Sequence, residues 1–264
     1  MLVTLITPTG TRQESFSRCE FYMKRQTYKG PIQWIVVDDS EPKTKTTMGQ
    51  TYLKGPKTWR PGINTQRPNM DCALAHVKGD YIFVIEDDDY YAEDYLEKYI
   101  YMLKDYSAVG EANALYYNIL SRSWRRWGNF SPHNTFALSY ASLCQSAIRK
   151  ELLPRLDEAI NCGELWPDIA LWRILNNHKV KPFLFCGQDL CVGIKGMPGR
   201  EGIGAGHHPD PSFEKDPSWA KLDTAIGVED ARYYKELVKT ISVKPVPNQI
   251  NPRIAAAQMV PKKA

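Results

Sequence analysis

Four consecutive carboxylates, from Glu86 to Asp89, are the sharpest chemical signal in the sequence. They directly follow an apolar run, 81–85, whose composition predicts a buried strand. Four adjacent negative charges repel one another and cost stability unless a cation or water relieves them. Carboxylate oxygens are ligands that suit Mg²⁺ or Mn²⁺. The alternative is a solvated acidic turn at the positive end of the next helix, but the position after an apolar strand favours a metal site.

Polar groups also follow two other apolar runs of the chain. Thr7, Pro8 and Thr9 end the run that begins at Leu2, and Asp38-Asp39 ends the run 32–37. In an open α/β sheet, ligands bind beyond the carboxyl ends of the strands. We therefore expect these residues and the acidic cluster 86–89 to line one site.

The elements that must position these groups are predicted by the hydrophobic pattern. Strand, helix and strand alternate at the spacing of right-handed βαβ units with a parallel sheet. Strands are predicted at 2–7, 32–37, 81–85, 115–120, 124–130 and 179–185, and helices near 16–23, 70–78, 93–104, 150–160, from 167 onward and at 228–240. The basic segment 41–69 is predicted to be a long loop with one short strand near Tyr52, and the six glycines of 193–208 predict another loop.

Composition excludes several classes of protein. The chain has 264 residues, of which 43% are hydrophobic and 24% charged, with a formal net charge of +4. These values are typical of a globular protein, and the mild positive charge fits phosphate-bearing ligands without demanding nucleic acid. We find no run of 18 apolar residues and no signal peptide, so we expect a cytoplasmic protein without an integral membrane segment. The six cysteines form no CxxC pair, and we expect them to be reduced.

The segment Gly79-Asp80-Tyr81-Ile82-Phe83-Val84-Ile85-Glu86-Asp87-Asp88-Asp89-Tyr90-Tyr91 resembles the region around the DXD motif of glycosyltransferases with the GT-A fold, especially family 2. The helix at 69–75, the strand end 36–40 and the segment 6–9 are similar to that family too. The resemblance implies an α/β fold of GT-A type, with a Rossmann-like, mixed but mostly parallel sheet flanked by helices. It departs from the family at Glu86, where many members have the first Asp.

The resemblance also implies roles in the first half of the chain. Donor-binding residues would be Thr7, Pro8, Thr9 and Arg12 beside the nucleotide, Asp38 or Asp39 on the base or ribose, Arg67 near the base or phosphates, and Asp87 on the ribose. Asp88 is the preferred ligand of Mn²⁺ or Mg²⁺, with Glu86 and Asp89 as further candidates.

In the second half, the segment 166–173 resembles the place where inverting members keep their general base. Asp168 is the candidate base and Glu164 the second candidate. The alternative for Asp168 is an acid that stabilises a helix start.

The loop 193–208 and an aromatic segment supply further candidates. Lys195 and Arg200 of the glycine-rich loop are expected to contact the donor diphosphate, and His207 and His208 to bind the metal. Trp124, Arg126, His133 and Trp166 are candidate acceptor-site residues. Alternation of cations and aromatics over 122–127 also fits an ordinary strand with one buried face.

These inferences predict one GT-A domain over 1–240. It comprises a nucleotide-sugar-binding half (1–110), an acceptor and catalytic half (111–210), a C-terminal helix (211–240) and then a basic, proline-containing tail (241–264). The expected function is metal-dependent transfer of a sugar, with inversion, from a UDP-sugar to a carbohydrate or a modified nucleic acid. The alternatives are a viral-type DNA glycosyltransferase acting on modified bases, and a nucleotide- or carbohydrate-binding module without catalysis. A nucleotidyltransferase is disfavoured because no glycine-rich signature with Lys or Arg follows the first strand.

Overall fold

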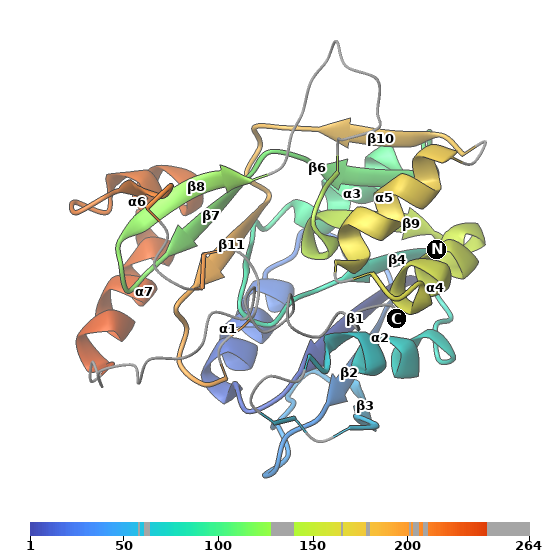
Figure 1. The fold of residues 1–264 in the computed structure, drawn as a ribbon, viewed down its shortest axis with the longest axis horizontal. Helices are drawn as coiled ribbons and strands as arrows, with labels where there is room; N and C mark the ends of the chain where they lie inside the picture. Colours follow the sequence, from blue (N-terminus) through green and yellow to red (C-terminus); the bar gives the residue numbers. More distant parts are fainter. Residues whose placement is uncertain are drawn as a thin grey trace, which may run out of the picture.

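A computed structural model describes residues 1–57, 59–60, 64–127, 140–164, 166–177, 180–200, 202, 206–207 and 211–241. Its larger sheet has seven strands in the order β10-β6-β9-β4-β1-β2-β3 (Figure 1). All neighbours in it are parallel except those of β9, which runs antiparallel to both β4 and β6. The strands are β1 (Val3–Thr9), β2 (Ile32–Asp38), β3 (Thr51–Lys54), β4 (Tyr81–Val84), β6 (Ala108–Glu111), β9 (Ser146–Arg149) and β10 (Pro182–Phe185).

Helices cover both faces of this sheet, which is why its central strands β1, β2 and β4 are buried along most of their length. Alternate side chains of β1 and β2 enter two separate cores. One core joins the sheet to α1 (Gln13–Lys24) and α3 (Tyr95–Met102), and the other joins it to α2 (Gln66–Leu74), α4 (Leu153–Asn161) and α5 (Pro167–Asn177). The expected mixed, mostly parallel α/β fold is confirmed.

A smaller sheet packs beside the first core, in the order β12-β8-β7-β11-β5. Its strands are β5 (Tyr90–Tyr91), β7 (Ala114–Asn118), β8 (Ser123–Trp127), β11 (Cys191–Lys195) and β12 (Glu214–Lys215). The strands predicted at 115–120 and 124–130 are confirmed as β7 and β8, which pair antiparallel. The helices α6 (Ala220–Ile226) and α7 (Val228–Thr240) lie beside this sheet in Figure 1. Two single turns, η2 (Leu143–Gln145) and η3 (Lys150–Leu152), flank β9.

Two sequence predictions are wrong in their boundaries. The helix predicted at 70–78 begins four residues earlier, at Gln66, and ends at Leu74. The first turn of this helix is polar, because it belongs to the site described below. It therefore shows no pattern of apolar residues from which the helix start could be predicted. The loop predicted from Gly193 begins only after Lys195, because Gly193 lies within β11. A Cβ on Gly193 would lie 2.6 Å from the ring of Tyr116, so this glycine permits close strand packing rather than a flexible loop.

The predicted loop over 41–69 is shorter than expected, and its one predicted strand is confirmed as β3, parallel to β2. Asp38 organises the segment before β3. Its carboxylate accepts hydrogen bonds from the backbone N–H and hydroxyl of Ser40, the N–H of Thr44 and the hydroxyl of Tyr52. Although burial opposes ionisation, these bonds lower the pKa of Asp38. The side chain of Asp38 is therefore engaged in folding the loop.

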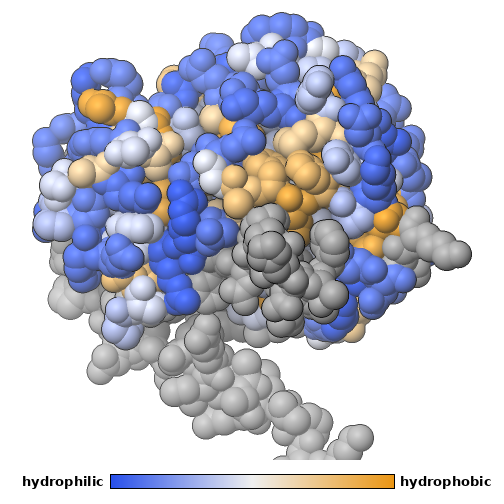
Figure 2. All heavy atoms as spheres, turned by 90° about the horizontal axis from the view of Figure 1, so that it is seen from above, coloured by the Kyte–Doolittle hydropathy of each residue, from blue (hydrophilic) through white to orange (hydrophobic). Residues whose placement is uncertain are grey.

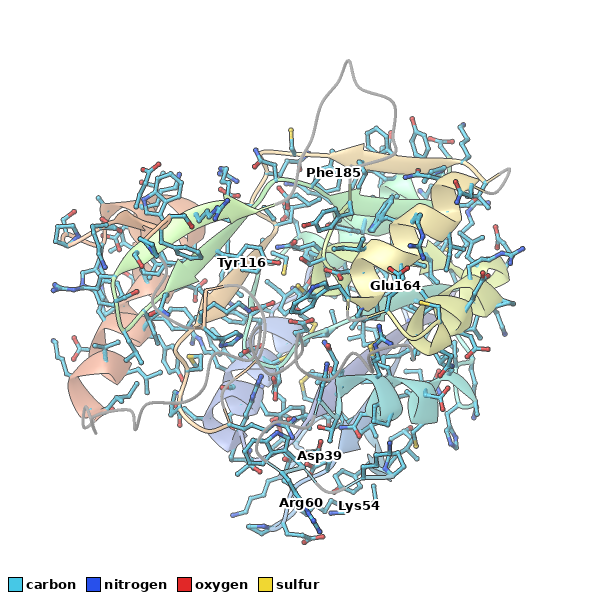
Figure 3. The ribbon with its side chains drawn as sticks, viewed as in Figure 1. Asp39, Lys54, Arg60, Tyr116, Glu164 and Phe185 are labelled. Atoms are coloured by element: carbon cyan, nitrogen blue, oxygen red, sulfur yellow. The ribbon has the colours of Figure 1, made fainter. Side chains whose placement is uncertain are left out.

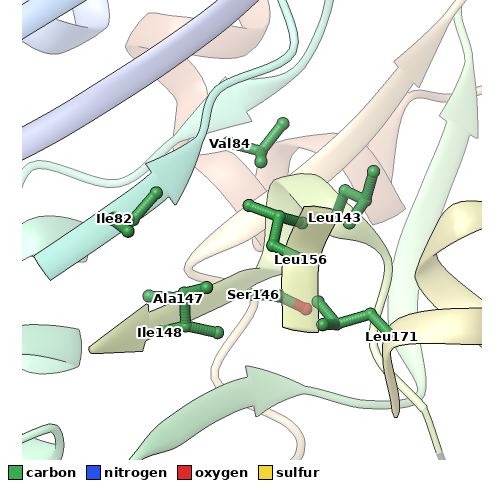
Figure 4. Close-up of a pocket in the computed structure, with 8 residues that line it drawn as sticks. All are labelled: Ile82, Val84, Leu143, Ser146, Ala147, Ile148, Leu156 and Leu171. Carbon is green, nitrogen blue, oxygen red and sulfur yellow. The ribbon is translucent and has the colours of Figure 1, made fainter. Parts of the chain in front are cut away.

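Surface and interior divide as expected for a globular domain. Figure 2 shows mainly hydrophilic side chains over the face seen from above, with a hydrophobic group near its middle. The apolar pocket of Figure 4 is a void of only about 10 Å³ between β4, β9 and the helices α4 and α5. That volume is at the lower limit for one water molecule, so the pocket is a packing defect rather than a ligand site. None of the helices in the described part of the chain is long and apolar enough to cross a membrane.

Candidate active site

The carboxyl ends of the adjacent strands β4, β1 and β2 meet at one edge of the larger sheet, as the sequence predicted. Thr9 and Asp87 confirm this proximity, because the Thr9 hydroxyl donates a 2.6 Å hydrogen bond to Asp87 Oδ2. The turn 86–89 is held by Tyr91 of β5, whose hydroxyl accepts the Glu86 N–H at 2.7 Å. Thr7 is not part of the edge, because its hydroxyl accepts from Trp34 Nε1 in the core.

The acidic cluster, defined as Glu86 to Asp89, is neutralised by cations of the protein. Arg12 Nη1 lies 2.9 Å from Asp87 Oδ1 and 3.0 Å from Asp88 Oδ2. Lys195 Nζ lies 3.1 Å from Asp89 Oδ1. Lys195 belongs to β11 and is almost fully buried, so the prediction that it acts from a mobile loop is wrong.

The four carboxyl groups differ in acidity. Burial raises the pKa of Glu86 to about 8, and the charges of Asp89, Asp88 and Asp168 act in the same direction. Burial likewise raises the pKa of Asp89 to about 6 despite the nearby Lys195. At Asp88, burial is outweighed by the charges of Arg12, Lys195 and His207, which lower the pKa to about 2. Asp88 is therefore the member of the cluster that stays ionised under all ordinary conditions.

The acidic cluster fits a divalent cation. Glu86, Asp88 and Asp89 each place a carboxylate oxygen within 4.8 Å of the others. Asp89 Oδ2 is buried and has no hydrogen-bond partner among the described residues. Hard oxygen ligands of this kind suit Mg²⁺ or Mn²⁺. The charge of His207 reaches Asp88, which agrees with the predicted place of this residue, whereas His208 lies outside the described residues.

Thiols form a second group beside Asp89. Cys144 and Cys191 are buried, and each places its sulfur within 4.8 Å of the other and of an Asp89 oxygen. The hydrogen bond that the Cys144 thiol donates to Cys191, together with burial, raises the pKa of Cys144 well above its ordinary value. Protonated thiols are poor metal ligands, so the carboxylates are the better candidate. All six cysteines are free, as expected.

The second part of the site lies at the end of β2. Asp39 is fully buried and accepts hydrogen bonds from Arg200 Nη1 at 2.7 Å and from Asn69 Nδ2 at 3.1 Å. Because Asp38 is used within its own loop, Asp39 is the residue of the pair that belongs to the site. In the view of Figure 3, Asp39, Lys54 and Arg60 all lie in the lower part of the molecule.

Asn69 and Trp59 were not singled out as site residues from the sequence. Asn69 contacts Asp39 and leaves its own buried Oδ1 without a partner among the described residues, and the Arg200 guanidinium lies 5.5 Å from the Trp59 ring. Arg67, in the same helix turn as Asn69, has a buried Nη2 that also lacks a partner there. The one sequence signal that could have indicated Asn69 is its position in the helix at 69–75, which is similar to the family.

Asp168 lies in the first turn of α5, where it accepts the Ile169 N–H at 2.9 Å. Burial raises the pKa of Asp168, and its charge reaches Glu86 of the acidic cluster. Glu164 precedes α5 and instead pairs with Arg173, whose partly exposed side chain belongs to that helix. The two candidate bases therefore differ, because the charge of Asp168 acts on Glu86 of the cluster whereas Glu164 is paired with Arg173.

Several predicted acceptor residues have structural partners. Arg126 makes a two-pronged ion pair with Asp189 at 2.7 and 2.8 Å. Trp124 packs against the first core, with Lys221 over its ring. These contacts favour the alternative of an ordinary strand for 122–127. Trp166 is partly buried just before α5, and His133 lies outside the described residues.

Comparison with known proteins agrees with this architecture. A model of the family described as glycosyl transferase family 2 matches residues 4–157, which is more than half of the chain. The chain belongs to glycosyl transferase family 2. No curated protein matches this family 2 chain. The match ends before α5, so it includes the acidic cluster but neither Asp168 nor Arg200.

Solved structures show the same fold for this family 2 chain. The crystal structure of S. aureus TarS gives a TM-score of 0.50 at 14% identity and covers 74% of this chain and 37% of TarS. The structure of TarS 1–349 gives a TM-score of 0.52 at 13% identity, covering 74% of this chain and 60% of that one. This family 2 chain thus spans 37% and 60% of the lengths of these two structures, in both cases less than two thirds. The GT-A fold expected from the sequence is confirmed.

Replacing Lys195 with methionine is expected to destabilise the protein by about 3–5 kcal/mol, because it leaves Asp89 buried without its cation. The free energy of unfolding in urea, measured with EDTA present, checks this. The matched control is Lys98→Met, which removes an exposed pair with Asp94 and should cost no more than about 0.5 kcal/mol. Equal losses in the two variants would contradict the prediction.

Stability is expected to fall as pH rises from about 5 to about 8, because of Glu86. The folded protein keeps a proton on Glu86 up to a pKa of about 8, whereas the unfolded chain releases it near 4.5. The unfolded state thus binds fewer protons in this window, so the stabilising effect is lost as pH increases. Urea unfolding of Glu86→Gln should show a flatter pH dependence, and an equally steep one would contradict this assignment.

Proposed function

We propose that this chain is a metal-dependent, inverting glycosyltransferase that uses a nucleoside-diphosphate sugar, with a UDP-sugar favoured by the family resemblance. The observation that carries the proposal is the meeting of Thr9, Asp39 and the acidic cluster at one sheet edge. This edge is where α/β proteins bind nucleotides. Asp168, whose charge reaches the same cluster, supplies a base.

In this proposal the donor lies across the ends of β1, β2 and β4. Asp39 with Asn69 would face the nucleoside, and Asp87 the ribose. Asp88, with Glu86, Asp89 and His207 around it, would hold the divalent ion. When bound, such an ion neutralises charge on the leaving diphosphate. Arg67, whose buried Nη2 has no hydrogen-bond partner among the described residues, would contact the donor.

The transfer step needs a base on the acceptor side. The acceptor hydroxyl oxygen forms a bond to the anomeric carbon, and the bond from that carbon to the diphosphate oxygen breaks. The electron pair leaves with the nucleoside diphosphate, and the hydroxyl proton passes to the Asp168 carboxylate. A pKa raised by burial makes Asp168 a stronger base than an exposed aspartate.

Calorimetric titration of UDP, GDP, CDP and dTDP, with Mn²⁺ and again with EDTA, tests the proposal. We expect one nucleotide to bind, and to bind more tightly with Mn²⁺. Absence of binding for all four nucleotides under both conditions would contradict the glycosyltransferase proposal.

A modified nucleic acid is a second candidate acceptor. Lys45, Lys57 and Arg60 are exposed on the segment between β2 and α2, the segment that follows Asp39 in the chain. Cations beside the donor site favour an anionic acceptor. Binding to duplex DNA that weakens steeply with salt would support this acceptor, and binding that does not depend on salt would contradict it.

A further inference from the structure

Arg200 fills the place beside Asp39 that a nucleoside would need. Its Nη1 lies 2.7 Å from Asp39 Oδ1 and donates to the Thr65 hydroxyl at 3.3 Å. The side chains of Arg200 and Asp39 are 11% and 0% exposed. The other oxygen of Asp39 accepts from Asn69, so each oxygen has a partner within the protein. The Asp39 side chain has no exposed surface, so a nucleoside cannot reach it while Arg200 stays.

The backbone around Arg200 is docked on the turn that follows β1. The Arg200 N–H donates to the Thr11 carbonyl at 3.3 Å, and Arg12 Nε donates to the Arg200 carbonyl at 2.8 Å. Gly199 has a φ of +106°, and a Cβ there would lie 2.5 Å from the Thr11 oxygen. Only glycine permits this approach, so the chain is built to place Arg200 against Asp39.

Arg12 extends the same arrangement to the acidic cluster. Its guanidinium binds Asp87 and Asp88 while its Nε holds the Arg200 carbonyl. Two linked arginines thus cover the carboxylates that the proposed donor and metal require. A buried carboxylate is costly without a partner, so these cations stabilise the site when no donor is bound.

We propose that Arg200 is an internal occupant of the nucleoside subsite, and that the donor binds only after displacing it from Asp39. This inference rests on the proposed function, because it assumes that a nucleotide binds at this edge. Glycines at 196, 199, 202 and 206, three of them at positive φ, flank Arg200 and permit the backbone to rearrange. The affinity for nucleoside is then lowered by the fraction of molecules in which Arg200 has left Asp39.

Uridine is the sharpest probe, because it lacks the phosphates to which a displaced Arg200 can also bind. We expect Arg200→Ala to bind uridine more tightly than the unsubstituted protein by about tenfold or more, since the contact with Asp39 no longer competes. Calorimetry with uridine and with UDP, in Mn²⁺ and in EDTA, measures this. The matched control is Arg232→Ala on α7, whose 61% exposed side chain pairs with Glu229, and it should leave both affinities unchanged.

A second variant, Arg200→Gln, keeps a neutral hydrogen-bond donor near Asp39, so its gain in uridine affinity should be smaller. This variant also tests the inference if Arg200→Ala does not fold. The inference is supported most strongly if both variants bind uridine and the unsubstituted protein does not. UDP binding by the unsubstituted protein, with uridine binding no tighter in either variant, would overturn the inference and leave the proposed function intact. Absence of nucleotide and nucleoside binding in all proteins would overturn both.

Discussion

Asp168→Asn is expected to lower the rate of sugar transfer by about 10³-fold, within the range lost when a general base is removed. Asparagine keeps the shape of the side chain and can still accept the Ile169 N–H, but it cannot take the acceptor proton. Asp168 belongs to α5 rather than to the ends of β1, β2 and β4. The affinity for UDP should therefore remain within about twofold of that of the unsubstituted protein. Initial rates at saturating donor, with UDP calorimetry on the same samples, check both parts.

Glu164→Gln is the control for this prediction. Glu164 is held in an ion pair by Arg173, whereas Asp168 is one of the charges that raise the pKa of Glu86. This variant should retain nearly full activity. If Glu164→Gln lost activity and Asp168→Asn did not, the base would be Glu164. If neither the variants nor the unsubstituted protein transferred sugar to any acceptor while UDP bound normally, a binding module without catalysis would be the better description.

Asp88→Asn is expected to weaken Mn²⁺-dependent UDP binding by about 100-fold, or roughly 2.8 kcal/mol. Asp88 is the one carboxyl of the cluster whose pKa is lowered, to about 2, whereas Glu86 and Asp89 have pKa values raised to about 8 and 6. A metal ligand with a raised pKa must first lose a proton, but Asp88 is already ionised. Calorimetry with Mn²⁺ and with EDTA separates the metal-dependent part of the affinity.

The control for Asp88 is Asp94→Asn on α3, which removes an exposed carboxylate paired with Lys98 and should leave UDP binding unchanged. UDP binding by the unsubstituted protein that is as tight in EDTA as in Mn²⁺ would contradict the metal-dependent part of the proposal. In that case Arg12 and Lys195 would be the only cations that the acidic cluster requires.

The first half of the fold was predictable because its strands are short apolar runs that end in polar residues. Thr9, Asp39 and Asp87 come together because parallel neighbours present their carboxyl ends at one edge, and this order follows from βαβ connections alone. The strands β5, β6, β9, β11 and β12 were not predicted, since their runs of two to five residues carry too little periodicity to indicate a strand.

What the sequence by itself determined is the kind of chemistry: an acidic turn after a buried strand, polar strand ends and an acid at a helix start. What only the tertiary structure decided is which of these groups are already paired. Arg12, Lys195 and Arg200 lie 75 to 161 positions from the carboxylates they bind, counting Arg12 to Asp87, Lys195 to Asp89 and Arg200 to Asp39. No local pattern encodes such contacts, because they depend on how the separate elements pack, and that packing brings the cations to buried carboxylates that would otherwise be too costly to keep charged.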